Sequence, residues 1–264
     1  MLNLRKYFTL LLMIPALMGV EGQKMYHNTS GELIFSQSRV NFSPEFLQQY
    51  PDAEMAKNNV RFTCFLHLAE YWHYDLNNIF GFITGLGVRN IGMITDENLP
   101  ETVTLTNQTV QYRHYKIVRR LYTLGVPLAV KIGSFKDHLF FFAGGEYEFA
   151  LQYKEKFWSD TWDRSGPKTK SSTWFGNQTP TFLPSVFGGV QMPGGINLKF
   201  KYYLQDFLNN GFTIRRNTEE GASFNISDLS RYSKSQVFYL SLSLQFNTAY
   251  LTKKQWQTDQ IACK

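Results

Sequence analysis

The sequence predicts an all-β protein, an eight-stranded antiparallel up-and-down transmembrane β-barrel. Three observations support this fold class. Eight segments alternate bulky apolar residues with small or polar ones, and a period of two indicates β-strands. The connections between these segments alternate between long and short. Beyond the amino-terminal segment, no apolar run approaches the roughly 20 residues that a membrane-spanning helix needs.

Composition agrees with this class. The chain has 264 residues, a length that a single β-barrel often reaches. Charged residues make up only 18%, below the roughly 25% of soluble domains. The mean hydropathy of −0.29 excludes a helical membrane protein. The net charge is +6, but the basic residues form no run along the sequence, so we expect no nucleic-acid partner.

The amino terminus has the features of a secretory signal peptide. Arg5 and Lys6 precede an apolar run at residues 7–20, and small residues stand before Gln23. A transmembrane anchor, the alternative, needs a longer run. The predicted domains are therefore a signal peptide at 1–22, an outer-membrane β-barrel at 23–249 and a periplasmic carboxy-terminal tail at 250–264.

The first three predicted strands are 32–40 (ELIFSQSRV), 60–69 (VRFTCFLHLA) and 79–92 (IFGFITGLGVRNIG). A long polar segment separates the first two, whereas the shorter EYWHYDLNN joins the second to the third as a turn. The glycines of the third segment do not form a dinucleotide-binding motif, because no helix follows them. In a barrel, such glycines let strands curve and leave room inside.

The fourth and fifth predicted strands, 116–133 and 138–154, are joined by the tight turn SFKD. We expect one set of their side chains to face lipid and the other set to fill a narrow lumen. In the lumen set, Gly125 and Ala129 would leave room for Lys131. The lipid-facing set comprises Leu124, Val126, Leu128, Val130 and Ile132, then Leu139, Phe141, Ala143, Gly145, Tyr147, Phe149, Leu151 and Tyr153.

The last three predicted strands are 181–191, 196–207 and 236–247, and the tight MPGG joins the first two of them. Residues 196–207 alternate in the same way, with Phe200 outward and with Lys199 and Lys201 inward. Pro127 and Pro184 lie inside strand patterns, where each should remove a ladder bond or mark a bulge.

The alternation of loop lengths assigns the two rims. Up-and-down barrels of the outer membrane have short periplasmic turns and long extracellular loops. A soluble lipocalin-like barrel, the alternative, would invert the faces and place the apolar set in its core. The polar faces are rich in glycine and lightly charged, and the strands are long for a globular protein, so we favour the membrane.

The predicted lumen carries a candidate charge network of Arg89, Lys131, Glu146, Glu148, Lys199 and Lys201. Glu146 and Glu148 could also form a glycosidase pair. Buried charges need partners of opposite sign, however, so we favour neutralised carboxylates and expect no enzyme. The chain contains no G-x-S-x-G motif, although an active site assembled across strands remains an alternative.

Few residues suggest ligands. His67 and His73 do not have the spacing of a metal site, and we expect neither metal nor cofactor. Cys64 and Cys263 could form one disulfide, but two cysteines make no framework. The loop aromatics Trp158, Trp162 and Trp174 could form an interfacial girdle, which we favour, or a binding platform.

Several stretches resemble the small outer-membrane β-barrel proteins of Bacteroidota, namely 73–94, 124–148, 153–158, 179–209 and 234–248. The resemblance implies an integral barrel in a bacterial outer membrane. It implies no single activity, because such barrels include porins, adhesins and secretion accessories, and no catalytic residues carry over. The chain departs from barrels that end on an aromatic residue, since it continues past Phe246 to Lys264.

The predicted function is that of an integral, multi-pass outer-membrane barrel with a structural, binding or assembly and secretion-accessory role. The alternatives are a porin-like small-solute channel or carrier, and a soluble lipocalin-like ligand-binding barrel. Expected partners are outer-membrane lipid and lipopolysaccharide, the barrel-assembly machinery during biogenesis, and a secretion-system or surface partner.

Overall fold

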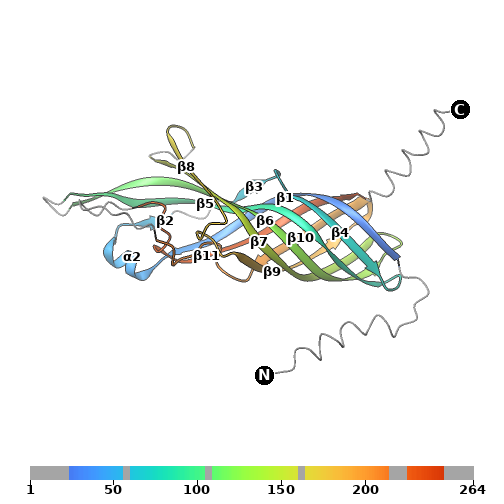
Figure 1. Ribbon diagram of the computed structural model, residues 1–264. Coiled ribbons are helices and arrows are strands. Elements are labelled where there is room, and N and C mark those ends of the chain that lie inside the picture. Colours follow the sequence, from blue (N-terminus) through green and yellow to red (C-terminus); the bar gives the residue numbers. More distant parts are fainter. Residues whose placement is uncertain (1–23, 56–59, 105–108, 160–163, 214–224, 247–264) are drawn as a thin grey trace, which may run out of the picture.

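The computed structural model describes residues 24–55, 60–104, 109–159, 164–213 and 225–246 (Figure 1). The predicted signal peptide and carboxy-terminal tail lie outside these residues, as do Trp162 and Cys263. In the part of the chain that is described, none of the helices is both long enough and apolar enough to cross a membrane.

In these described ranges, eleven strands, one α-helix and one short 3-10 turn follow one another. They are β1 (Lys24–Phe42), α2 (Pro44–Gln49), β2 (Glu54–Met55), β3 (Arg61–Thr63), β4 (Leu68–Asp75), β5 (Phe80–Thr104), β6 (Thr109–Ser134), β7 (Leu139–Ser159), β8 (Lys168–Trp174), β9 (Phe182–Gln191), η1 (Pro193–Gly195), β10 (Ile196–Tyr203) and β11 (Tyr232–Phe246).

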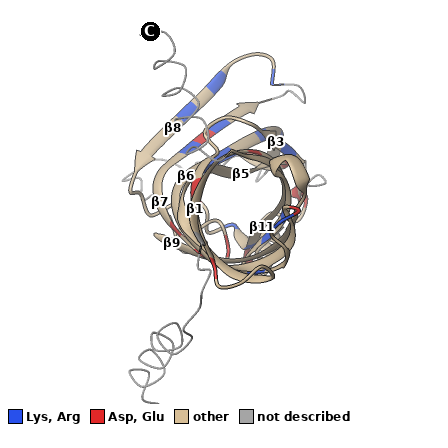
Figure 2. Cartoon of the chain, turned by 90° about the vertical axis from the view of Figure 1, so that its right-hand side faces the viewer, with Lys and Arg blue, Asp and Glu red and all other residues tan. Residues whose placement is uncertain are grey.

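Eight of the strands close into one antiparallel ring, as the sequence predicted. The order around the ring is β1, β4, β5, β6, β7, β9, β10 and β11, and β11 pairs again with β1, for example at Leu33 and Leu242. The view of Figure 2 looks into this ring. The short strands β2, β3 and β8 add to β5, β1 and β7 at the end where the long connections lie.

The predicted loops contain more strand than expected. A loop was predicted at 93–115, but β5 runs to Thr104 and β6 begins at Thr109, so the two strands form one long hairpin. The predicted loop at 155–180 is likewise part strand, because β8 pairs with the end of β7. These segments lie outside the predicted alternating strands, yet their β-branched residues suit paired strands outside a membrane as well. This end of the barrel therefore extends into a paired ribbon (Figure 1).

The second predicted strand was also placed too early. Its turn was expected directly after Ala69, but β4 continues to Asp75. Asn77 makes the turn itself, since its side-chain oxygen accepts bonds from the backbone N–H groups of Ile79 (2.8 Å) and Phe80 (2.7 Å). His73, predicted near a turn, is instead a strand residue and is buried.

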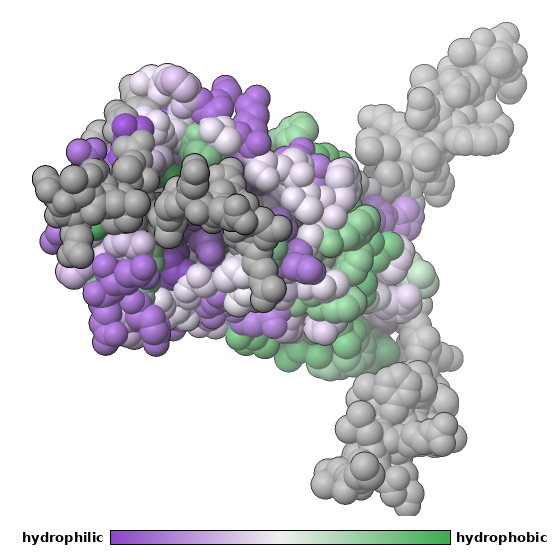
Figure 3. Space-filling view, turned by 60° about the vertical axis from the view of Figure 1, so that its left-hand side comes forward, coloured by the Kyte–Doolittle hydropathy of each residue, from purple (hydrophilic) through white to green (hydrophobic). Residues whose placement is uncertain are grey.

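The faces of the barrel are those predicted. Leu128 and Phe141 are 64% and 69% exposed, whereas Lys131 and Glu148 are each 0% exposed. Exposed apolar side chains from all the ring strands form a belt around the short-turn half of the barrel, and Figure 3 shows one side of this belt. An inverted, lipocalin-like interior is excluded, because the lumen holds the charges and the belt holds the apolar side chains.

One residue of β7 changes the alternation. Tyr122 pairs with Gln152 and Thr123 pairs with Ala150, so Leu151 is an extra residue, a β-bulge. Beyond the bulge the faces exchange. Tyr153, predicted to face lipid, is buried. The prediction was wrong here because an alternating pattern does not reveal an inserted residue.

Pro127 interrupts a ladder as predicted. The β5–β6 ladder pairs Thr84 with Leu128 and Gly87 with Gly125, but the two positions between them are skipped. The register is the same on both sides. Proline has no N–H group to donate, so the interruption reflects a missing hydrogen bond in the ladder and not a shift of the strand register.

Candidate functional site

The central lumen holds six charged side chains from four strands. At these positions the side chains alternate between the two faces of the wall, and all six point inward. Glu32 comes from β1, Arg89 from β5, Glu146 and Glu148 from β7, and Lys199 and Lys201 from β10. We call these six residues the central cluster.

The central cluster is electrically neutral, because three cations balance three carboxylates. Lys199 lies 2.8 Å from Glu32, and Arg89 lies 3.4 Å from the same carboxylate. Lys201 lies between the other two carboxylates, 2.7 Å from Glu146 and in contact with Glu148. Arg89 also bonds Glu146. These pairs offset the large cost of removing ions from water.

Hydroxyl groups donate further hydrogen bonds to two of the carboxylates. The Tyr71 hydroxyl donates to Glu32 (2.9 Å), while those of Tyr203 (2.9 Å) and Thr123 (2.7 Å) donate to Glu148. The sequence analysis did not name Glu32 or Tyr71 as site residues. The signal for Glu32 was present, since it shares the inward set of its strand with Ile34 and Ser36.

Lys131 lies apart from the central cluster, contrary to the single network that the sequence suggested. Its ammonium lies 2.5 Å from Asp75 and 2.9 Å from the Tyr26 hydroxyl, near the short-turn rim. His73 is 3.2 Å from it and stacks on Tyr26. The ring of Phe135 lies 4.3 Å from the same ammonium, so this end of the lumen is filled as well.

A second ion-pair cluster lies at the long-loop end and was not predicted. Glu97 is its centre, with Arg231 at 3.2 Å, Arg119 at 3.5 Å and the Tyr232 hydroxyl donating at 2.5 Å. Arg119 also lies 3.0 Å from Glu155. Burial by itself would raise the pKa of Glu97, but the two arginines outweigh it and hold the pKa below its ordinary value.

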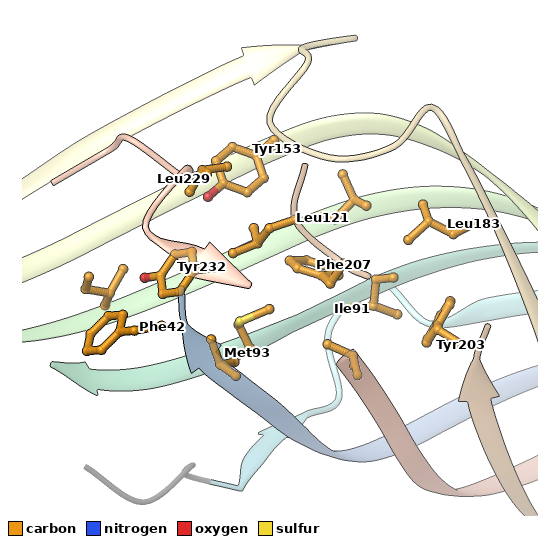
Figure 4. Close-up of a cluster of buried hydrophobic side chains, with 14 of the residues drawn as sticks. Phe42, Ile91, Met93, Leu121, Tyr153, Leu183, Tyr203, Phe207, Leu229 and Tyr232 are labelled. Carbon is orange, nitrogen blue, oxygen red and sulfur yellow. The ribbon is translucent and has the colours of Figure 1, made fainter. Parts of the chain in front are cut away.

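A hydrophobic layer separates the central cluster from the long-loop cluster. Ile91, Met93 and Leu121 point inward from β5 and β6, and Phe207 and Leu229 from the loop after β10 meet them (Figure 4). Farther out, Phe46 of α2 packs on Phe42, with ring centroids 5.0 Å apart. The connections therefore fold back over the lumen and plug it.

Little empty space remains in the part of the lumen around the central cluster that the described residues line. A cavity of about 20 Å³ between the central cluster and the Lys131 group is lined by residues such as Tyr71, Phe142 and Lys199. That volume holds about one water molecule. Through the described residues, charged and apolar layers thus close the barrel at successive levels.

The predicted loop aromatics lie in two different environments. Trp158 is 7% exposed and packs with Ile94 and Val118 on the ribbon, so it is not a girdle residue. Trp174 is 62% exposed beside Phe175, which is also exposed. The Phe175 ring lies 5.9 Å from that of Phe149 in the lipid-facing wall. Trp174 therefore lies where a girdle is expected.

Metal ligands are not gathered anywhere in the described ranges, which contain no group of three or more His, Cys, Asp or Glu side chains suited to an ion. His67 is buried and lies 3.2 Å from the Thr63 hydroxyl. Cys64 is a free, exposed thiol.

Comparisons with known proteins add little. No protein-family model matches the chain, and no curated protein matches it. Ail, the attachment invasion locus protein of Yersinia pestis, matches at 14% identity with a TM-score of 0.32, over 83% of this chain and 99% of that one. The structure of Ail in complex with the heparin analogue sucrose octasulfate matches at 13% identity with a TM-score of 0.33, over 83% of this chain and 99% of that one. The outer membrane protein OprG from Pseudomonas aeruginosa matches at 8% identity with a TM-score of 0.31, over 84% and 96%.

At such low identities and TM-scores, neither a role nor a ligand carries over to this chain. The barrel is established by the strand pairing and side-chain burial of the chain itself.

Proposed function

We propose that this chain is an integral bacterial outer-membrane protein whose sealed barrel conducts no solute. Its barrel is a rigid membrane scaffold that presents the ribbon of β5 to β8 and the adjoining connections outside the membrane for binding. The observation that carries this proposal is the closure of the lumen by two ion-pair clusters with an apolar layer between them.

The distribution of side chains supports the membrane location. Phe141 and Phe200 are among the exposed residues of the apolar belt, and in water such a continuous belt would be an aggregation hazard. In lipid the belt is solvated, and the closed ring leaves no backbone edge unpaired. Contacts with lipid and lipopolysaccharide, and insertion by the barrel-assembly machinery, follow from this proposal.

The bonding of the central carboxylates supports a role without catalysis. Glu146 is held by Arg89 and Lys201, and Glu148 by Lys201 and two hydroxyl groups. A glycosidase pair must face a cleft that admits a sugar, whereas these carboxylates are buried. A Bacteroidota origin and a secretion-accessory role stay predictions of the sequence.

Conductance of the full chain in planar lipid bilayers tests the proposal. We expect no stepwise current, because the two clusters and the apolar layer between them fill the part of the lumen that the described residues line. Reproducible current steps would instead support the channel or carrier alternative. Each sample is run on a gel with and without boiling, since a folded barrel migrates differently from its denatured chain. Identical mobility, with the protein in the soluble periplasmic fraction, would refute the membrane location.

A further inference from the structure

Five basic side chains gather on the outer face of the ribbon at the long-loop end. They are Arg120 of β6, Lys154 and Lys156 of β7, and Lys168 and Lys170 of β8. We call them the basic patch. Arg120 pairs with Lys154 and Lys156 pairs with Lys170, so like charges stand opposite one another across the sheet. Figure 2 shows the positive residues along β8 and on the neighbouring strands.

The bulge at Leu151 decides which way these charges point. Beyond it, Tyr153 and Glu155 turn into the lumen, and Lys154 and Lys156 turn outward. Lys170 of β8 pairs with Lys156 and therefore points to the same outward face, and so does Lys168, two residues away on the same strand. The lysines are therefore on the outer surface of the wall, away from the carboxylates of the lumen.

Within the described residues, none of the five members takes part in an ion pair. The Nε atom of Arg120 is buried without a hydrogen-bond partner. Partial burial and the neighbouring cations lower the pKa of Lys156. Like charges opposite one another destabilise a sheet. An arrangement that costs stability in this way calls for an external anion.

The height of the patch identifies the kind of anion. Trp174 pairs with Gln152 at the exposed aromatic level, and Ser172, Lys170 and Lys168 follow away from the belt. These charges lie roughly 7 to 20 Å beyond Trp174 along the strands, which is about 5 to 15 Å in height at a strand tilt of about 40°. Phospholipid headgroups occupy only about 5–8 Å outside the hydrocarbon. A small headgroup reaches only Lys154 and its pair Arg120, whereas a tall, phosphorylated saccharide reaches every member.

We propose that the basic patch binds the phosphate groups of lipopolysaccharide in the outer leaflet. The proposal rests on the outer-membrane location above. Lysine and arginine both bind phosphate, and the exposed hydroxyl residue Ser172 of β8 lies on the same face, paired with Lys154. Trp174 and Phe175, directly below, pack against the acyl chains of the same lipid.

The test measures binding of the full-length barrel, folded in neutral detergent, to immobilised lipopolysaccharide. The patch variant K154Q/K156Q/K170Q should bind about tenfold or more weakly than wild type, because each juxtamembrane cation contributes to attraction of anionic lipid. The matched control R39Q/K136Q/K234Q removes three charges elsewhere and should bind within about threefold of wild type. Raising the salt concentration should weaken binding of wild type and control more than that of the patch variant.

Two further arms identify the ligand. Chemically dephosphorylated lipopolysaccharide should bind wild type as weakly as intact lipopolysaccharide binds the patch variant. Soluble polyphosphate should compete only weakly, since it lacks acyl chains. Equal affinities of patch and control variants, undiminished binding of the dephosphorylated lipid, or polyphosphate that competes as well as the lipid would each overturn the inference.

The gel assay keeps this outcome apart from that of the proposed function. Every variant must show the mobility change of a folded barrel on boiling. If the barrel inserts but the variants bind alike, only the lipid site is wrong. If wild type itself fails to insert into vesicles, the membrane location is wrong.

Discussion

Replacing Lys201 with methionine removes the ammonium that lies between two lumen carboxylates, Glu146 and Glu148. The side chain is fully buried, and methionine fills a similar volume, so the change acts mainly on charge. The central cluster then holds two cations and three carboxylates, and one buried negative charge has no counterpart.

The magnitude follows from the remaining bonds. Breaking a buried pair by removing one partner typically costs about 3–5 kcal/mol. Glu148 keeps hydrogen bonds from Tyr203 and Thr123, and Arg89 lies 3.8 Å away. We therefore expect K201M to lose about 3 kcal/mol, the lower end of that range. The double variant K201M/E148Q restores neutrality and should recover about half of that loss or more.

The assay is equilibrium unfolding in urea of the full chain in lipid vesicles, followed by tryptophan fluorescence. The control K136Q, in an exposed turn, should change the free energy of unfolding by no more than about 0.5 kcal/mol. The electrostatic reasoning fails if K201M is as stable as wild type, or if the double variant is less stable than the single one.

Three further predictions concern other parts of the molecule. L128K places a charge in the lipid-facing belt and should cost about 2–4 kcal/mol if the site is near the midplane, measured as vesicle insertion and urea stability; unchanged insertion would contradict the orientation of the wall. G144A should destabilise by about 1–3 kcal/mol, because an added Cβ meets the backbone of Leu128 and Ala129, while G31A, with nothing within 4 Å, should be nearly neutral; equal effects in the same unfolding assay would refute the packing. For Glu97, whose folded pKa is lowered, stabilisation is present above the ordinary carboxyl value of about 4.3 and is lost as pH falls through the lowered one. E97Q should therefore be less stable than wild type at pH 7 and approach it below about pH 4, and a gap that stays constant with pH would sink this explanation.

The alternating pattern of the sequence was enough to predict the barrel and many of the side chains that face its lumen. Side chains of β10 alternate strictly, so Lys199 and Lys201 had to share a face opposite Phe200, and they do. The lengths of the connections indicated the tight turns, because two adjacent antiparallel strands need only a few residues between them. Gly125 was predicted to leave room for a long lumen side chain, and an added Cβ there would meet the side chains of Glu146 and Glu148.

The ion-pair and hydrogen-bond partners of each charged side chain could not be predicted from the sequence. Lys131 bonds Asp75 and Tyr26, which come from other strands, because the stagger of the ring sets its height in the lumen. The cluster around Glu97 arose in segments whose polar composition suggested loops. Periodicity predicts whether a side chain faces the lumen or the outside. It does not predict the level along the barrel at which residues of two strands lie side by side.

By itself, the sequence determined the period of two, the alternation of connections, and hence a closed barrel with charges inside, since apolar side chains at every second position need a common environment. Only the tertiary structure decided which charges meet. The register shift at Leu151 turned Lys154 and Lys156 outward, and pairing with β8 brought Lys168 and Lys170 beside them. The basic residues form no run along the chain and become a patch only in the sheet, because strand pairing joins residues that the sequence keeps apart.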